Sequence, residues 1–223
     1  MRKFRALGIV GALFLVLAIS GCASGTSAPY PPVVTVEILS DQPSDGDIAF
    51  DSVASSYTVT QGTATLFFGI DILNPNTPEY RAFLDFPLDG STGGPAIPLN
   101  ATIVSAVVKV SIVSVEFART IPTLMDLVTY PIGGLTSADY NSAPLTYPSG
   151  GFAYRSFDFL ATDAGYDVAI DVTSLMQEAQ RRGLADFQVR FLLDFIPNPV
   201  GFVSIDDQPT VAITAPRLTV QYY

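Results

Sequence analysis

The sequence predicts an all-β protein, a β-sandwich or jelly roll with one short helix. Three observations lead to this prediction. Hydrophobic residues make up 48% of the 223 residues and charged residues only 14%, with 15 Phe and 10 Tyr, a composition typical of strands. Apolar and polar residues alternate in several segments that are separated by turn clusters of Gly, Pro, Asp and Asn. Only one segment has the signals of a helix.

The first third of the chain contains the less regular strand segments. Residues 33–39 alternate as a strand, and the sequence DQPSDGD at 41–47 is a turn cluster. Residues 48–60 and 64–70 are further predicted strands, and residues 74–78 (NPNTP) are a predicted loop. Many short strands with such turns between them are typical of a sandwich or jelly roll.

Four later segments alternate most cleanly, at residues 79–88, 102–115, 187–195 and 217–222. Apolar side chains occupy one face of each segment, which predicts strands with one buried side. Asp85 is predicted to face away from the core. Lys109, which follows Val108, is predicted to face outward. The residues predicted on the inner faces are Tyr80, Ala82, Leu84, Phe86, Leu88, Val104, Ala106, Val108, Val110, Ile112, Phe187, Val189, Phe191, Leu193, Phe195, Leu218, Val220 and Tyr222.

The one predicted helix lies near residues 173–182. Asp171 and Thr173 supply capping oxygens at its start, and two arginines lie in its last turn. Gly183 follows directly and is expected to end the helix in a left-handed conformation. A strand is expected to run up to Ile170 and lead into this helix.

The N-terminal residues predict export. Residues 1–21 combine three basic residues with an apolar run at 6–18 that is shorter than the roughly 20 residues of a membrane-spanning helix. The sequence ISGC at 19–22 resembles the lipobox of bacterial lipoproteins, in which the cysteine becomes acylated. An ordinary secretory signal with an incidental cysteine is the alternative. Residues 22–32 are then an acylated Cys22 and a tether, and residues 33–223 are a single β-sandwich domain.

The only cysteine and the charge balance constrain location and partners. Acylation explains why an exported chain has one unpaired cysteine, and the expected partner of Cys22 is a lipid bilayer. Ala23 follows Cys22 in place of an aspartate, so we expect an outer-membrane location in a Gram-negative host. Removing residues 1–21 leaves 8 of the 11 basic and all 21 acidic residues, a net charge of −13. Such a surface repels nucleic acid, which is excluded as a partner.

Four segments together resemble a known bacterial family, the DNRLRE-type domain. They are residues 81–86 (RAFLDF), 101–110 (ATIVSAVVKV), 171–175 (DVTSL) and 216–222 (PRLTVQY), and the resemblance spans roughly residues 48–223. It implies a β-sandwich of secreted and surface proteins, often found beside carbohydrate-active modules. Some relatives are classed as carbohydrate-binding modules.

The residue inventory excludes most catalytic chemistry. The chain has no histidine, so Ser-His-Asp and Cys-His catalysis and imidazole zinc sites are absent. A glycoside hydrolase built on two carboxylates is the remaining enzymatic alternative. Asp139 and the pair Asp206-Asp207 lie in predicted loops where such a pair is conceivable, although loop acids are usually solvated. The prediction is therefore that the protein is not an enzyme.

Two candidate binding sites follow from residue clusters. Calcium takes several oxygen ligands at flexible spacing, which makes four aspartates near a glycine turn a candidate metal site; the alternative is a solvated turn. Three tyrosines in a Pro/Gly/Ser-rich stretch are candidates for stacking on sugars; the alternative is that they pin a long loop onto the sandwich. The calcium candidates are Asp41, Asp45, Asp47 and Asp51, and the ligand-binding candidates are Tyr140, Tyr147 and Tyr154.

These observations leave three interpretations of function. The first is a noncatalytic lipid-anchored surface module that binds polysaccharide. The second is a structural or assembly lipoprotein that contacts envelope proteins, and the third is the carboxylate-based hydrolase. A solvent-exposed aromatic strip would favour the first, and a large apolar patch without a groove would favour the second.

Overall fold

The computed structural model describes residues 31–132, 134–194, 200–208 and 214–223. The chain divides into two compact units, Met1–Pro32 and Val33–Tyr223. The predicted signal peptide, Cys22 and most of the predicted tether lie outside the described residues, as does Phe195. The description below concerns the unit Val33–Tyr223.

The described part of this unit is built mainly of antiparallel strands, which confirms the predicted all-β class. It contains one α-helix and two short 3-10 turns, η1 (Ser137–Asn141) and η2 (Ala161–Asp163). The remaining elements are β1 (Val34–Leu39), β2 (Gly46–Asp51), β3 (Ser56–Gln61), β4 (Thr65–Ile70), β5 (Glu79–Pro87), β6 (Ile103–Glu116), β7 (Thr120–Val128), β8 (Tyr154–Leu160), β9 (Asp167–Asp171), α1 (Thr173–Arg182), β10 (Asp186–Leu193), β11 (Phe202–Asp206) and β12 (Arg217–Tyr222).

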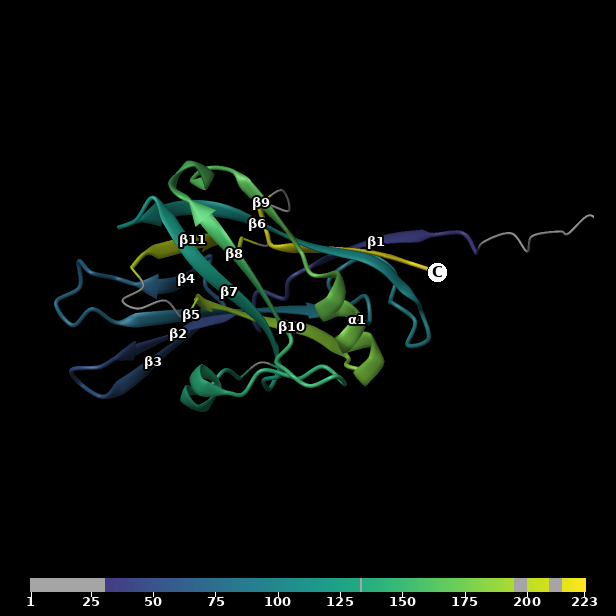
Figure 1. Cartoon of the computed structure of the whole chain (residues 1–223), viewed down its shortest axis with the longest axis horizontal. Coiled ribbons are helices and arrows are strands. Elements are labelled where there is room, and N and C mark those ends of the chain that lie inside the picture. The colour runs from purple at the N-terminus through teal and green to yellow at the C-terminus, as the bar shows by residue number, and fades with distance from the viewer. Residues whose placement is uncertain (1–30, 133, 195–199, 209–213) are drawn as a thin grey trace, which may run out of the picture. The chain divides into compact units, whose positions relative to one another are not determined.

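The strands form one continuous sheet that curls over a core (Figure 1). The order along the sheet is β1-β12-β6-β11-β4-β5-β10-β7-β8, with the β2–β3 hairpin joined to β5 and with β9 joined to β6. The long strand β6 links the two layers, because β12 and β9 pair with its first half and β11 pairs with its second half. Strand β11 then leads into β4 and the opposite layer.

The predicted inner face of β6 is correct from Ala106 to Ile112 but wrong at Val104. Val108 is fully buried and the side chain of Lys109 is partly exposed, as predicted. Leu84 of β5 is also fully buried. The pairing of β6 with β12 shifts register beside Val104, so Ile103 points into the core and Val104 is exposed. A β-bulge of this kind reverses the alternation on one side of it.

The prediction of one buried side is wrong for residues 82–87 of β5 and for most of β10, which are buried on both faces. Tyr80, predicted on the inner face, is partly exposed. Phe83 and Asp85 lie opposite the main core and are nonetheless fully buried, and Gln188 and Arg190 are almost fully buried. The cause is the long connection between β7 and β8, which covers the outer face of this part of the sheet. Its residues form a second hydrophobic cluster with residues of β2, β5 and β7, namely Ile48, Phe83, Val128, Tyr130, Leu135 and Tyr140.

A buried ion pair holds this connection in place. Arg190 Nη2 donates to Asp126 Oδ2 at 2.6 Å, and both side chains are almost completely buried. Arg190 Nη1 also donates to the carbonyl oxygens of Asp139 and Tyr140 at 3.2 and 2.9 Å. The guanidinium therefore supplies hydrogen-bond donors to two buried carbonyl oxygens of the connection, which the strands of the sheet do not reach.

Helix α1 begins and ends where the sequence predicts. The Asp171 carboxylate accepts the backbone N–H of Thr173 at 2.9 Å, and Gly183 ends the helix with φ = 65°. The capping position itself is Val172, which makes no side-chain cap. Leu175, Met176 and Ala179 belong to the main core, so the helix closes the core beside β6 (Figure 1).

Candidate functional site

The structure does not bring the three predicted tyrosines together. Tyr140 is part of η1 in the β7–β8 connection and is buried against the sheet, where its ring lies 5.2 Å from that of Tyr57 between centroids and 3.9 Å from the Arg81 guanidinium. Tyr147 is partly buried against the core, and its hydroxyl donates to Ser174 on α1. Tyr154 lies on β8 and is exposed. The prediction of a shared stacking site is therefore wrong, and two of these rings pin the loop instead.

The four predicted calcium ligands are also separated. Asp41 binds the Ser44 hydroxyl, and Asp51 sits at the far end of β2, where its carboxylate accepts the N–H groups of Val53 and Ala54. Asp45 and Asp47 are both buried. Over the described ranges of the chain, no group of three or more acidic, histidine or cysteine side chains is placed to hold a metal ion. The four-aspartate calcium site is therefore a wrong prediction.

Several carboxyl groups are buried without positive partners. Burial raises the pKa of Asp47 and of Asp85 to about 7. Burial, followed by the charge of Asp207, raises the pKa of Asp45 well above its ordinary value, and burial also raises the pKa of Asp207. Asp45 accepts the backbone N–H of Asp85 at 2.6 Å. These groups are therefore protonated over a wider pH range than ordinary aspartates.

The buried acids are poorly suited to hydrolysis. Asp45 and Asp207 are 0% and 1% exposed, so a substrate between them would have no route to their oxygens. Asp139, the other predicted catalytic candidate, is buried and accepts the backbone N–H and the hydroxyl of Thr136. Its carboxylate therefore fixes the start of η1.

The most distinctive surface feature is a strip of four aromatic rings that come from β4, β5, β11 and the turn after β6. Phe202 is the centre of this aromatic strip: its ring stacks on Phe67 at 5.3 Å with an interplanar angle of 8°. Tyr80 meets Phe202 edge-on at 5.4 Å, and Phe117 lies 6.3 Å away on the other side. All four rings are partly exposed. Contacts of this geometry hold the rings in fixed positions.

Strand alternation produces the aromatic strip. Phe67 and Phe68 are adjacent in β4, so Phe68 enters the core and Phe67 must point outward. On β11, Val203 and Ile205 are buried, which leaves Phe202 on the outer face. Phe202 pairs with Gly69, where a Cβ would lie 2.2 Å from the Gly201 carbonyl oxygen, so only glycine lets the two backbones approach this closely.

The position of Phe117 requires strained backbone. This residue has φ = 67° in the turn between β6 and β7, a conformation that favours glycine and costs about 1–2 kcal/mol for other residues. The turn places the phenylalanine ring beside Phe202.

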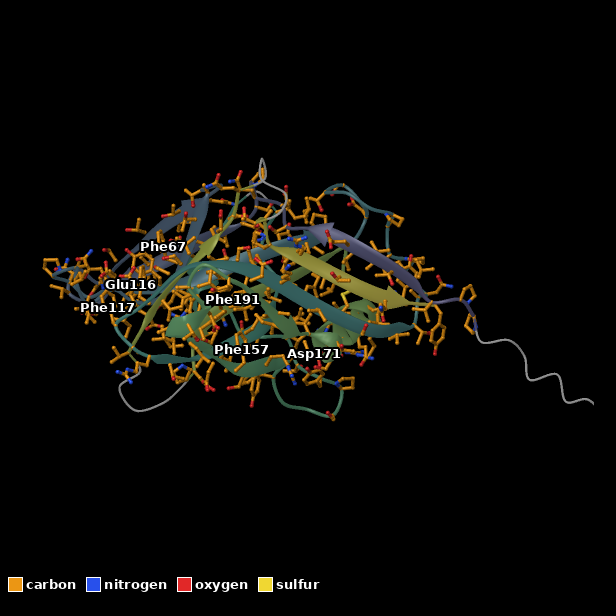
Figure 2. The ribbon with its side chains drawn as sticks, turned by 90° about the horizontal axis from the view of Figure 1, so that it is seen from above. Phe67, Glu116, Phe117, Phe157, Asp171 and Phe191 are labelled. Atoms are coloured by element: carbon orange, nitrogen blue, oxygen red, sulfur yellow. The ribbon has the colours of Figure 1, made fainter. Side chains whose placement is uncertain are left out.

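Polar groups border the aromatic strip. Ser114 of β6 and Ser204 of β11 lie on the same outer face with their hydroxyls 2.8 Å apart, and Glu116 is exposed beside Phe117. Figure 2 shows Phe67, Glu116 and Phe117 gathered toward one end of the domain, with Asp171 in its other half. Asp47 lies beneath the strip, where its Oδ2 accepts the Phe67 N–H at 3.3 Å.

The sequence signals for this site were present but weak. The pair Phe67-Phe68 in a predicted strand already requires one outward aromatic side chain. The position of Phe202 was hard to predict, because its strand has only five residues and follows a glycine. The position of Phe117 could not be predicted, because a positive φ is not expected for phenylalanine.

The sequence was compared with protein families and with curated proteins. No family model matches the chain, and no curated protein matches it. In the portion that the structure describes, none of the helices has the length and apolar character needed to cross a membrane. The fold and the surface together define the class: an antiparallel all-β domain that carries an aromatic strip on the outer face of its sheet.

Proposed function

We propose that the protein is a noncatalytic, lipid-anchored surface module that binds an extended polysaccharide on the aromatic strip. The observation that carries this proposal is the set of four contacting, partly exposed rings, one of them held by strained backbone. The surface thus has the flat aromatic character that stacks on sugar rings. The resemblance to the DNRLRE-type domain supports the same function.

The chemistry around the strip favours an uncharged ligand. Ser114 carries a partly exposed hydroxyl group near the rings, and the exposed Glu116, which accepts from that hydroxyl at 2.9 Å, offers a further acceptor for sugar hydroxyls. The predicted mature chain has a net charge of −13, which disfavours acidic polysaccharides. The buried carboxyl groups are closed to solvent, and this supports binding without turnover.

The place of the strip in the domain suits a surface-anchored protein. Strand β1 begins at the same end of the domain as the C-terminus (Figure 1). The aromatic strip lies toward the opposite end (Figure 2). Strand β1, which follows the predicted tether in the sequence, therefore begins at the end of the domain opposite to the strip.

A screen with soluble neutral polysaccharides tests the binding proposal. The full chain, solubilised in a neutral detergent, is run in native gels that contain hydroxyethyl cellulose, xyloglucan, galactomannan or mixed-linkage β-glucan. We expect at least one of these polymers to retard the protein, and acidic alginate to retard it less. Equal mobility in every gel would reject polysaccharide binding and favour the alternative of a structural lipoprotein that uses the strip to contact an envelope protein.

Replacement of the anchor cysteine tests the proposed location. Serine has no thiol, so Cys22→Ser is expected to abolish incorporation of radiolabelled palmitate and to release the protein from the membrane fraction. The Ser20→Ala variant keeps a small residue and serves as the control that retains the label. Labelled Cys22→Ser protein would contradict lipidation at this residue.

A further inference from the structure

A hollow of about 700 Å³ lies over β6, beside the aromatic strip. Its lining includes Ser111 of β6, Tyr166 and Asp167 from the start of β9, and Asp206 at the end of β11. Asp206 shares a face of β11 with Phe202, because both alternate with the buried Val203 and Ile205. The hollow and the strip therefore lie along the same face of β11.

Tyr166 offers an exposed ring on a fixed backbone. The ring is 70% exposed. Its main chain is tied down, because the Ile112 N–H donates to the Tyr166 carbonyl at 3.0 Å and the Tyr166 N–H donates to the Asp163 carbonyl at 2.9 Å. Because the backbone is already ordered, stacking on this ring costs only side-chain rotamer freedom.

Asp206 offers a partly exposed carboxylate in the lining of the hollow. Its Oδ1 is buried, and among the described residues no donor reaches that oxygen, so a ligand hydroxyl would approach the accessible side of the carboxylate. The neighbouring carboxylate of Asp167 is already engaged by Lys109 and Ser111, so Asp206 is the free acceptor of the pair.

The distance between the aromatic strip and the hollow corresponds to several units of a polysaccharide and not to a single sugar. Phe202 and Asp206 are four residues apart on β11, which corresponds to about 13 Å along an extended strand. Between them lie the buried Ser204 and the partly exposed Ser114, whose side chains are small. A polymer that reaches from Phe202 to Tyr166 would cross this part of the sheet.

We propose that the hollow is a second sugar subsite, in which Tyr166 stacks on one unit of a neutral polysaccharide while Asp206 accepts a hydrogen bond from its hydroxyl group. This inference rests on the proposed function. It adds that the ligand is an extended chain of several units that runs along β11, with its first contacts on the aromatic strip and its last in the hollow.

Affinity gels with the same four neutral polysaccharides test the subsite. Tyr166→Ala is expected to weaken the retardation constant about fivefold, whereas Tyr166→Phe keeps the ring and stays near wild type. Asp206→Ala is expected to weaken it about tenfold. Asp206→Ala removes an oxygen that has no donor, so its melting temperature is expected not to fall.

The outcomes separate the two proposals. If no polymer retards the wild-type protein, the proposed function fails, and the subsite fails with it. If the wild type is retarded and both Tyr166→Ala and Asp206→Ala match it, the strip is the whole site and the subsite alone is overturned. Lost binding together with a lowered melting temperature in Asp206→Ala would also overturn the subsite, because it would assign Asp206 a structural role.

Discussion

Raising the pH from about 5 to about 7.5 is expected to lower the free energy of unfolding by several kcal/mol. Burial raises the pKa of Asp47 and Asp85 to about 7, and it also raises the pKa of Asp45 and Asp207. An unfolded aspartate has a pKa of about 3.9, so the folded state holds more protons between these values. Stability from these groups is therefore complete below about pH 4 and is lost as the pH rises to about 7.

The size of the effect follows from the same groups. Each one contributes a slope of up to about 1.4 kcal/mol per pH unit between its unfolded and folded pKa. Asp51, Asp89 and Asp171 have lowered pKa values, and their contributions change only when the pH falls below about 4. The window from 5 to 7 is thus governed by the buried acids.

Urea unfolding at several pH values, with a chelator present so that no divalent cation neutralises the carboxylates, measures this slope. Asp85→Asn cannot ionise and is expected to reduce the slope, while Asp89→Asn, at an exposed position, is the matched control that leaves it unchanged. Stability that is flat or rises between pH 5 and 7.5 would show that these side chains are ionised in the folded protein.

Replacement of Arg190 by alanine is expected to cost about 3–5 kcal/mol, because it leaves the Asp126 carboxylate buried without its partner. The same change removes the donors to the Asp139 and Tyr140 carbonyls, so the β7–β8 connection should loosen. Chemical denaturation measures the loss, and proteolysis within residues 130–142 reports the loosening.

Two further variants define what Arg190 does. Arg119→Ala, at an exposed turn, is the control and should change stability by less than about 0.5 kcal/mol. Adding Asp126→Leu to Arg190→Ala should restore part of the loss, because no charge then remains buried. If Arg190→Ala melts like the wild type, the connection is held by its hydrophobic cluster alone.

The extent to which the sequence predicts the fold depends on how many faces of a strand are buried. Alternation of apolar and polar residues identified β6 and β12, because each of these strands has one buried side. Capping signals identified α1, because the start and the end of a helix are set by nearby residues. The same reasoning failed at Phe83 and Asp85, where a distant connection covers the second face. It also failed at Val104, because a bulge depends on the partner strand and has no local signal.

The candidate site was harder to predict than the fold. Aromatic residues were sought in a loop, yet Tyr140 is buried there because Phe50, Tyr57 and Arg81 surround its ring. The strip instead combines residues from β4, β5, β11 and the β6–β7 turn, which are up to 135 positions apart between Phe67 and Phe202. Only strand pairing in three dimensions brings such residues together.

The central claim, that the aromatic strip is the polysaccharide-binding surface, is tested most directly by a binding titration of three variants. Phe202→Ala removes the central ring and is expected to lower the affinity about tenfold. Phe117→Gly removes a ring while relieving strained backbone, so it should lower the affinity about fivefold without lowering the melting temperature. Tyr154→Ala, an exposed ring on β8, is the control and should bind like the wild type. Full affinity in Phe202→Ala and Phe117→Gly, or a loss confined to Tyr154→Ala, would contradict the claim.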